Sequence, residues 1–215
     1  MRRQQPDGLV FFLHGNAGNL DNWFRDADFY RQLNLDLVML DYRGYGKSGG
    51  RITGQQQMLS DIRAAWDAVS FRYEGLRRII IGRSLGTGFA AALAVQVQPE
   101  LTVLVSPYTS MRKLAREQYP WIPGLLVSYP LRTEEWLPRI RGDVLLLHGA
   151  RDLLITPTHS ERLQTLSATA DLILIPDAGH DDLNASQTFR DALRSAIAPS
   201  IGKPTPLVFT TQRPA

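Results

Sequence analysis

The chain alternates short apolar runs with longer segments of helical periodicity, and this alternation constrains its fold more than any other feature. Each run is apolar on both of its alternating faces, as strands covered by helices on both sides must be. In the intervening segment 53–74, Leu59, Ile62 and Trp66 recur at helical spacing and mark one buried face. We therefore predict an α/β fold with a doubly wound, mostly parallel sheet of about six strands. The predicted strands lie within 8–15, 35–42, 77–84, 101–108, 142–149 and 171–179.

Two stretches interrupt this alternation. Residues 109–139 are too long for a plain connection and are rich in Trp, Pro, Tyr and Leu, so we expect a small cap over one end of the sheet. Residues 200–215 are expected to form a tail, in which 207–211 is either plain tail or an added edge strand. Residues 1–215 as a whole are expected to form a single domain. The remaining helices are predicted after residue 84, from about residue 157, over 184–197 and over 22–33.

Composition excludes several classes of function. The formal net charge is only +3 and no basic run is present, so nucleic acid is not expected as a partner. No apolar stretch approaches the roughly eighteen residues of a spanning helix, and the start of the chain lacks the apolar segment of a signal peptide. A soluble, cytoplasmic protein is therefore expected. The absence of cysteine excludes disulfides, thiolate catalysis and zinc sites that use cysteine.

The segment GRSLG, residues 82–86, places Ser84 between two glycines where a β-branched run passes into an alanine-rich one. Such a strand-turn-helix context is that of a nucleophile elbow, in which glycines let helix and strand backbones approach closely. The positive end of the helix dipole would then favour negative charge developing near the serine. An ordinary turn of Gly and Ser is the alternative.

A serine nucleophile needs a base, and four histidines compete for that role. His180 lies just past the last predicted strand and is the best placed. His159 falls among polar residues of a predicted helix and is expected to be a solvated surface residue. His14 and His148 each occur in an LHG strand end, where an imidazole that organises the loop is expected.

The carboxylate that orients the base is predicted to be Asp152, at the end of the preceding strand. The chain order Ser84, Asp152, His180 is the one found in α/β-hydrolase triads. A neighbour in sequence is rarely able to align the far nitrogen of an imidazole, which disfavours the three aspartates near His180. These rivals are Asp177, Asp181 and Asp182.

Two backbone N–H groups are expected to bind the oxyanion of a tetrahedral intermediate. One belongs to Leu85, which follows the nucleophile, and the other to Asn16 in the loop HGNAGN after the first strand. The glycine-rich segment 41–50 is expected to be mostly a flexible connection, because its glycines have neither dinucleotide nor P-loop spacing. No His and carboxylate cluster has metal-ligand spacing, so neither cofactor nor metal is expected.

The segments HGNAGN, DYRGYGKSGG, GRSLGTG, HGARDLLITP and DAGHDDL occur in this order and resemble the α/β-hydrolase family of serine hydrolases. They are most similar to its small branch with an HGNAGN loop and a GRSLG elbow, which includes depalmitoylating thioesterases and membrane-associated lipid hydrolases. The similarity covers about residues 8–189. It implies Ser84 as nucleophile, Asp152 as acid, His180 as base, the N–H groups of Asn16 and Leu85 as oxyanion hole, and no cofactor or metal.

The chain departs from this family at its start. Family members usually have two further strands before the one that ends in HGNAGN, and many carry an N-terminal hydrophobic anchor. Without those strands, the run 35–40 is expected to be an apolar, unprotected sheet edge that promotes self-association, unless an N-terminal extension, a partner or residues 207–211 cover it. Membrane association is expected only if such an anchor precedes the chain.

We therefore expect a serine hydrolase that cleaves a carboxylic ester or thioester through an acyl-enzyme. An aminopeptidase-like serine peptidase and a non-catalytic binding protein of hydrolase fold are the alternatives. The apolar residues of the expected cap favour a substrate with a hydrophobic acyl group, although the same side chains could simply close the core. They are Trp121, Ile122, Leu125, Leu126, Val127 and Trp136.

Overall fold

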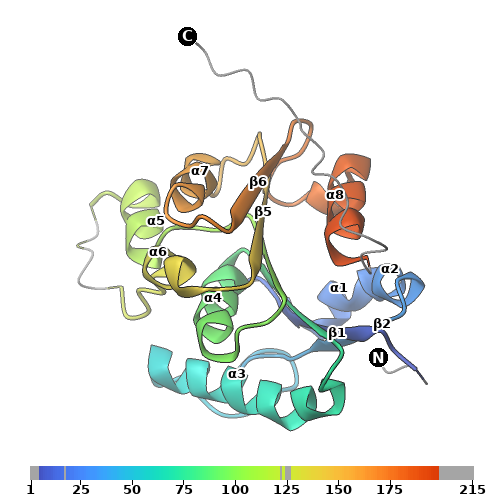
Figure 1. Ribbon diagram of the computed structural model, residues 1–215. Helices are drawn as coiled ribbons and strands as arrows, with labels where there is room; N and C mark the ends of the chain where they lie inside the picture. Colours follow the sequence, from blue (N-terminus) through green and yellow to red (C-terminus); the bar gives the residue numbers. More distant parts are fainter. Residues whose placement is uncertain (1–4, 17, 122, 124–126, 199–215) are drawn as a thin grey trace.

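The computed structural model describes residues 5–16, 18–121, 123 and 127–198, and its centre is a six-stranded sheet (Figure 1). The strand order is β2-β1-β3-β4-β5-β6 and every neighbouring pair is parallel. Each strand lies in one of the predicted apolar runs, except that β6 starts one residue before its run. The strands are β1 (Gly8–Leu13), β2 (Leu35–Met39), β3 (Arg77–Arg83), β4 (Leu101–Val105), β5 (Asp143–Gly149) and β6 (Ala170–Ile175).

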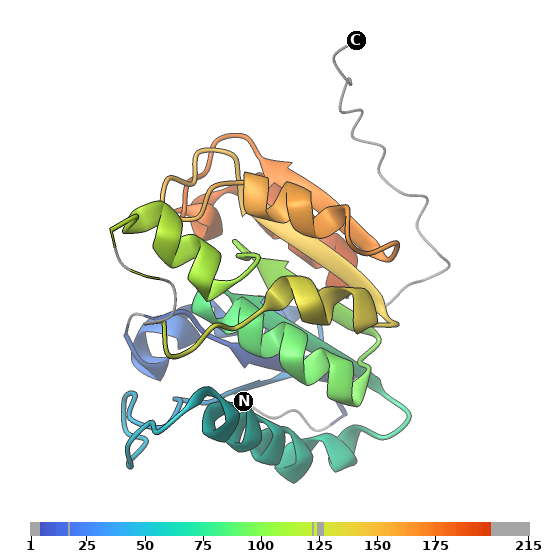
Figure 2. The same cartoon turned by 90° about the vertical axis from the view of Figure 1, so that its left-hand side faces the viewer.

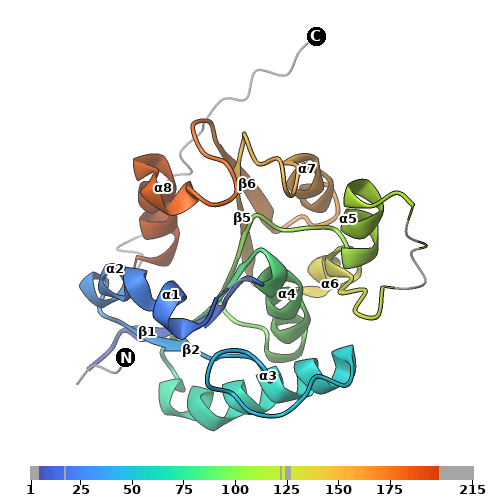
Figure 3. The same ribbon diagram turned by 180° about the vertical axis from the view of Figure 1, so that it is seen from behind.

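Helices cover both faces of the sheet, which confirms the predicted doubly wound α/β fold (Figures 1 and 3). The predicted helix over 22–33 is divided into two short helices by a 3-10 turn, Phe24–Asp26. One face carries α3 (Gln55–Ser70), α4 (Leu85–Val97), α5 (Met111–Gln118), α6 (Thr133–Trp136) and α7 (Thr158–Gln164). The other carries α1 (Leu20–Trp23), α2 (Ala27–Gln32) and α8 (Gln187–Ile197). Within the described part of the chain, no helix is both long and apolar enough to cross a membrane.

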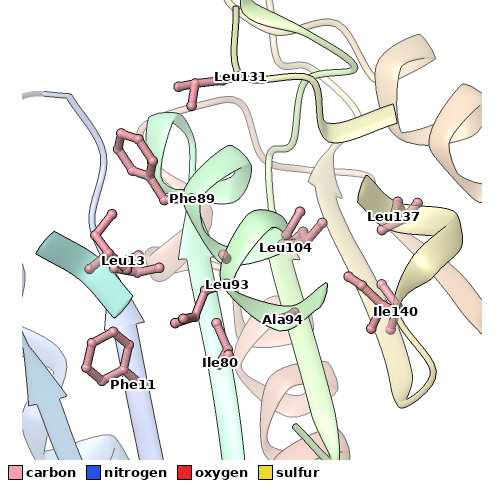
Figure 4. Packing of buried hydrophobic residues seen from close by; sticks show 14 of the residues in the cluster. Phe11, Leu13, Ile80, Phe89, Leu93, Ala94, Leu104, Leu131, Leu137 and Ile140 are labelled. Carbon is pink, nitrogen blue, oxygen red and sulfur yellow. The ribbon is translucent and has the colours of Figure 1, made fainter. Parts of the chain in front are cut away.

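The side chains on the two faces of the sheet belong to two separate hydrophobic clusters. In β1, Phe11 packs with α3 and α4, whereas its neighbours Val10 and Phe12 pack with α2 and α8. The Phe11 ring meets Trp66 of α3 edge-on, with ring centroids 5.4 Å apart. Full burial of one such side chain contributes about 1.5–3 kcal/mol, so both faces of the strand favour apolar residues. Figure 4 shows the cluster around α4, where Phe89 and Leu93 meet the sheet.

Strand β2 is the outer strand beside β1 in the described sheet, as the sequence predicts. The edge that was expected to be apolar and unprotected carries a charged residue, because Asp36 lies within β2 and is 1% exposed. Its carboxylate accepts a hydrogen bond of 2.6 Å from the hydroxyl of Tyr73. An inward-pointing charged residue is one of the features that discourage pairing at a sheet edge. Self-association through β2 stays a prediction.

The expected cap, 109–139, divides into two parts. Helix α5 lies at the outside of the molecule beside α7 and buries none of its residues fully (Figure 2). By contrast, α6 and the turn after it pack beside α4, and Leu137 and Ile140 enter the main core (Figure 4). Leu137, in the last part of the predicted cap, thus belongs to the main core, and the cap itself stays a prediction. Ile122, Leu125, Leu126 and the tail 200–215 lie outside the described residues.

Candidate active site

Ser84 lies on a sharp bend between β3 and α4, as the elbow motif predicts. Its backbone has φ 50° and ψ −119°, a conformation that costs on the order of 1–3 kcal/mol for a residue with a side chain. The bend is possible because Gly86 has no Cβ, which would collide with the carbonyl oxygen of Leu13 at the end of β1. After β1 the chain continues to β2 on one side of the sheet, and after β3 it continues through β4, β5 and β6 on the other side. Ser84, at the end of β3, therefore lies at a topological switch point.

The structure brings the three predicted triad residues together. His180 Nε2 lies 3.1 Å from Ser84 Oγ, and His180 Nδ1 lies 2.7 Å from Asp152 Oδ2. A carboxylate only accepts hydrogen bonds, so Nδ1 carries the proton and the Nε2 lone pair faces the serine hydroxyl. The His180 side chain is 12% exposed, whereas that of Asp152 is fully buried. The arrangement can therefore deprotonate a serine hydroxyl that solvent and substrate can reach.

The Asp152 carboxylate is held by more partners than the sequence indicates. Its Oδ1 accepts the backbone N–H groups of Leu154 at 3.0 Å and Ile155 at 2.8 Å. His148 Nε2 lies 3.3 Å from the same Oδ2 that faces His180. Burial alone would raise the pKa of Asp152, but the hydrogen bonds from His148, His180 and Ile155 outweigh it and hold the pKa well below its usual range. The carboxylate therefore stays ionised at neutral pH.

His148 organises its loop, as predicted, and also supports the carboxylate. Its Nε2 lies 2.7 Å from the carbonyl oxygen of Ile155, which can only accept, so Nε2 carries the proton. Its Nδ1 lies 2.6 Å from the hydroxyl of Ser160, which then donates to it. The i, i+4 spacing of His148 and Asp152 is the only sequence signal that could have indicated their contact.

The rival aspartates do not contact the base. Asp182 accepts the N–H of Gly179 at 2.6 Å, and Asp177 accepts the hydroxyl of Ser186 at 3.3 Å. Asp181 is exposed, and the partner of His180 Nδ1 is Asp152. Of the four candidate aspartates, Asp152 is therefore the one in contact with His180.

His159 is not the solvated residue that the sequence predicts. Its side chain is fully buried, with Nε2 2.7 Å from Glu117 and Nδ1 accepting the N–H of Thr109 at 3.2 Å. Burial lowers the pKa of His159, and the neighbouring Glu117 carboxylate partly opposes this shift. The prediction failed because α5 covers the face of α7 that the sequence left to solvent. The contacts of His159 therefore join α5 to α7, and they are not contacts with the triad residues.

The loop after β1 approaches the nucleophile closely. A Cβ on Gly15 would lie 3.5 Å from the Cβ of Ser84 and 3.0 Å from the ring of Trp23, so only glycine fits there without displacement. The Nδ1 of His14 donates to the carbonyl oxygen of Gly15 at 2.7 Å and fixes the course of the loop. Leu85 begins α4, so its N–H has no acceptor within the helix. The elements that carry both expected oxyanion donors, Asn16 and Leu85, thus meet beside Ser84.

The segment 41–50 does more than the flexible connection predicted for it. The hydroxyl of Tyr42 donates to the carbonyl oxygen of His14 at 2.8 Å, and the hydroxyl of Tyr45 donates to Asn16 Oδ1 at 2.7 Å. These two contacts hold the loop that carries one expected oxyanion donor. Two tyrosines at the carboxyl end of a strand, within an otherwise small and polar segment, are the signal that could have found them.

No group of three or more His, Cys, Asp or Glu side chains placed to hold a metal ion occurs among the residues that the structure describes. The polar groups that converge at the elbow are the Ser84 hydroxyl, the His180 imidazole and the Asp152 carboxylate. Their arrangement can transfer an acyl group by way of a covalent serine intermediate.

Known proteins resemble this chain in sequence and in fold. An uncharacterized protein of Mycobacterium tuberculosis is 34% identical over 193 residues, which cover 86% of this chain and 68% of that protein. Alpha/beta hydrolase domain-containing protein 17B of Homo sapiens is 28% identical over 197 residues, which cover 88% of this chain and 66% of that protein. The chain thus spans about two-thirds of the length of these relatives.

Among solved structures, Est1E from Butyrivibrio proteoclasticus, bound to ferulic acid, superposes with a TM-score of 0.75 at 17% identity. The superposition covers 93% of this chain and 94% of that one, and it supports the fold. The family model described as serine aminopeptidase, S33 matches residues 4–135, a segment that includes Ser84 and ends before Asp152 and His180. Because this match spans more than half of the chain, and the motifs, fold and elbow agree with it, the chain belongs to the serine aminopeptidase S33 family of α/β hydrolases.

Proposed function

We propose that this protein is a serine hydrolase that cleaves carboxylic esters or thioesters through an acyl-enzyme intermediate. The observation that carries the proposal is the continuous contact from Ser84 Oγ through His180 to Asp152, over 3.1 Å and 2.7 Å. Nucleophile, base and orienting acid are each within hydrogen-bond reach of the next, which is the geometry that activates a serine.

The reaction would proceed in two halves. Ser84 Oγ bonds to the carbonyl carbon as its proton passes to His180 Nε2, and the carbonyl electron pair moves to oxygen, where the N–H groups of Leu85 and Asn16 receive it. Collapse of this intermediate breaks the bond to the alcohol or thiol, which takes the proton from His180. Water then attacks the acyl-serine by the same steps and releases the acid.

The surface beside the triad favours a hydrophobic acyl group. Leu153 and Leu154 follow Asp152 directly and are 88% and 49% exposed. Gln118 Nε2 donates to the carbonyl oxygen of Leu154 at 2.9 Å and so brings the end of α5 against this loop. Beyond α5, Tyr119 and Trp121 are 53% and 75% exposed. Exposed apolar side chains on and beside the loop that follows Asp152 suit an acyl chain better than a charged substrate.

Peptide hydrolysis is the second candidate, because the matched family model carries the description serine aminopeptidase. The same triad could attack an amide, and the fold does not fix the substrate. Turnover of aminoacyl p-nitroanilides, measured beside p-nitrophenyl esters, separates the two. We expect the ester reaction to dominate.

A fluorophosphonate probe and a series of p-nitrophenyl esters test the proposal. The probe should label Ser84, and kcat/KM should rise at least tenfold from the acetate to the hexanoate ester, roughly the effect of burying two of the four added methylenes. Labelling at another serine would contradict the assignment of Ser84. A protein that neither reacts with the probe nor turns over any ester would instead be the non-catalytic alternative.

The pH dependence of ester hydrolysis should show a single rising limb. The imidazole can accept the serine proton only when it is neutral, so kcat/KM should rise with pH over the near-neutral range and then level off. The lowered pKa of Asp152 keeps that carboxylate ionised throughout this range, so it adds no second limb. Rates that fall over this interval, measured at constant ionic strength, would argue against a histidine base.

A further inference from the structure

Arg83 is a buried cation beside the nucleophile that the triad chemistry does not use. It ends β3, immediately before Ser84, and is 5% exposed. Its Nη2 donates to the carbonyl oxygen of His180 and its Nη1 donates to Asn184 Oδ1, each over 2.6 Å. The strand that carries the nucleophile therefore binds the backbone of the residue that supplies the base. A buried guanidinium is costly, so such a contact needs compensation nearby.

The compensation comes through Asn184. Its Nδ2 donates to Asp26 Oδ2 at 2.6 Å, so the amide group connects the guanidinium to a carboxylate on the turn before α2. Burial lowers the pKa of Arg83, and the carboxylates of Asp181, Asp152 and Asp26 oppose this shift. Arg83 is thus a charged group fixed by neighbours on two sides, with little freedom to move.

A third contact leads from Arg83 to the other half of the site. The guanidinium lies over the ring of Trp23 in α1, 5.9 Å from its centroid. The same ring also faces Gly15, where an added Cβ would lie 3.0 Å from Trp23 Cζ2. Gly15 precedes Asn16, the expected oxyanion donor. Arg83 therefore touches the base loop directly and the oxyanion loop through Trp23.

We infer that Arg83 is a positioning residue, which holds the imidazole of His180 and the oxyanion loop at fixed places relative to Ser84. The inference rests on the proposed hydrolase function. In that reaction His180 takes up and returns a proton twice, and a displacement of about 1 Å costs on the order of 10²-fold in rate. Arginine suits this role because its planar fork donates in two directions at once, whereas lysine presents a single ammonium.

The test compares Arg83→Met and Arg83→Lys with a matched control on the same strand. Arg77, at the opposite end of β3, also donates from its guanidinium to backbone carbonyl oxygens, those of Ile197 and Ala198. Arg83→Met should lower kcat and the rate of fluorophosphonate labelling by roughly 10²-fold, with KM changed less than about twofold. Arg83→Lys should retain an intermediate kcat. Arg77→Met should lower Tm but leave kcat unchanged.

Chemical rescue separates positioning from a general loss of structure. In Arg83→Ala, millimolar guanidinium chloride should restore part of kcat, whereas equal urea should not, because only the cation can replace both donated hydrogen bonds and the charge. The kcat of Arg77→Ala should be unchanged with or without guanidinium. If Arg83→Met proves unfolded, Asn184→Ala keeps Arg83 but removes its link to Asp26, and should lower kcat about tenfold with KM unchanged.

The outcomes distinguish the two proposals. A wild-type protein that is neither labelled nor active overturns the hydrolase function itself. An active wild type, with Arg83→Met folded and its kcat within twofold of normal, overturns the positioning role alone. If Arg83→Met does not fold, an unchanged kcat in Asn184→Ala overturns the positioning role of Arg83 equally.

Discussion

Ser84→Ala should lower ester turnover by on the order of 10⁶-fold and abolish labelling by a fluorophosphonate. The reason is local, because the Oγ atom removed is the one that His180 Nε2 approaches at 3.1 Å. The fold should persist, since the elbow itself is held by the backbone. The N–H of Ser84 donates to the carbonyl oxygen of Val105 at 2.9 Å and its carbonyl oxygen accepts the N–H of Thr87, and alanine keeps both bonds. Tm should therefore change little.

Ser106 offers a matched control for this experiment. It directly follows the last residue of β4 with the same φ of 50°, is fully buried, and its Oγ has no hydrogen-bond partner among the described residues. Ser106→Ala should therefore retain turnover and labelling. Equal loss in both variants would show that the effect of Ser84→Ala comes from disturbed packing at the strand ends. Retained turnover in Ser84→Ala would mean that another residue is the nucleophile.

The parts of this protein that were predictable from sequence are those set by local pattern and by strand order. Helices on both faces require apolar residues on both sides of each strand, so the six runs were recognisable before their pairing was known. The elbow needs glycine at position 86 because α4 begins against β1, and the GRSLG motif shows that glycine directly. Asp152 and His180 followed because the carboxyl ends of parallel strands meet at one edge.

The parts that were not predictable depend on packing between distant segments. His159 is buried because α5 lies over α7, and nothing within the helix that carries it indicates that neighbour. Leu137 would be equally apolar in a cap or in a core connection, so its place in the main core was not predictable from its sequence neighbours. Arg83 bonds to a residue 97 positions away, and its role is visible only once both loops are placed.

Asp152→Asn should lower kcat by about 10⁴-fold while leaving KM nearly unchanged. The structure gives the reason, because Asp152 Oδ2 accepts the Nδ1 proton of His180 at 2.7 Å. An asparagine can keep the bonds from the N–H groups of Leu154 and Ile155 through its Oδ1, and its NH₂ group then faces His180. That amide favours the imidazole tautomer with its proton on Nε2, which cannot accept the proton of Ser84. Asp182→Asn is the matched control. It should keep kcat within about threefold, because the Asp182 carboxylate binds the N–H of Gly179 and not His180, and an asparagine Oδ1 can still accept that N–H.

The Tm of Asp152→Asn as a function of pH gives a second test, which separates orientation of the base from damage to the fold. The folded-state pKa of Asp152 is held well below its usual range, so its ionised form stabilises the native state above the unfolded-state pKa of about 3.9. This contribution is lost as the pH falls through the lower, folded value. Asp152→Asn should therefore have a lower Tm than the wild type at pH 7, and the difference should shrink below about pH 4. A difference in Tm that stays constant from pH 7 to pH 3 would show that the carboxylate charge does not stabilise the folded site, and the electrostatic account of the Asp152 cluster would then be wrong.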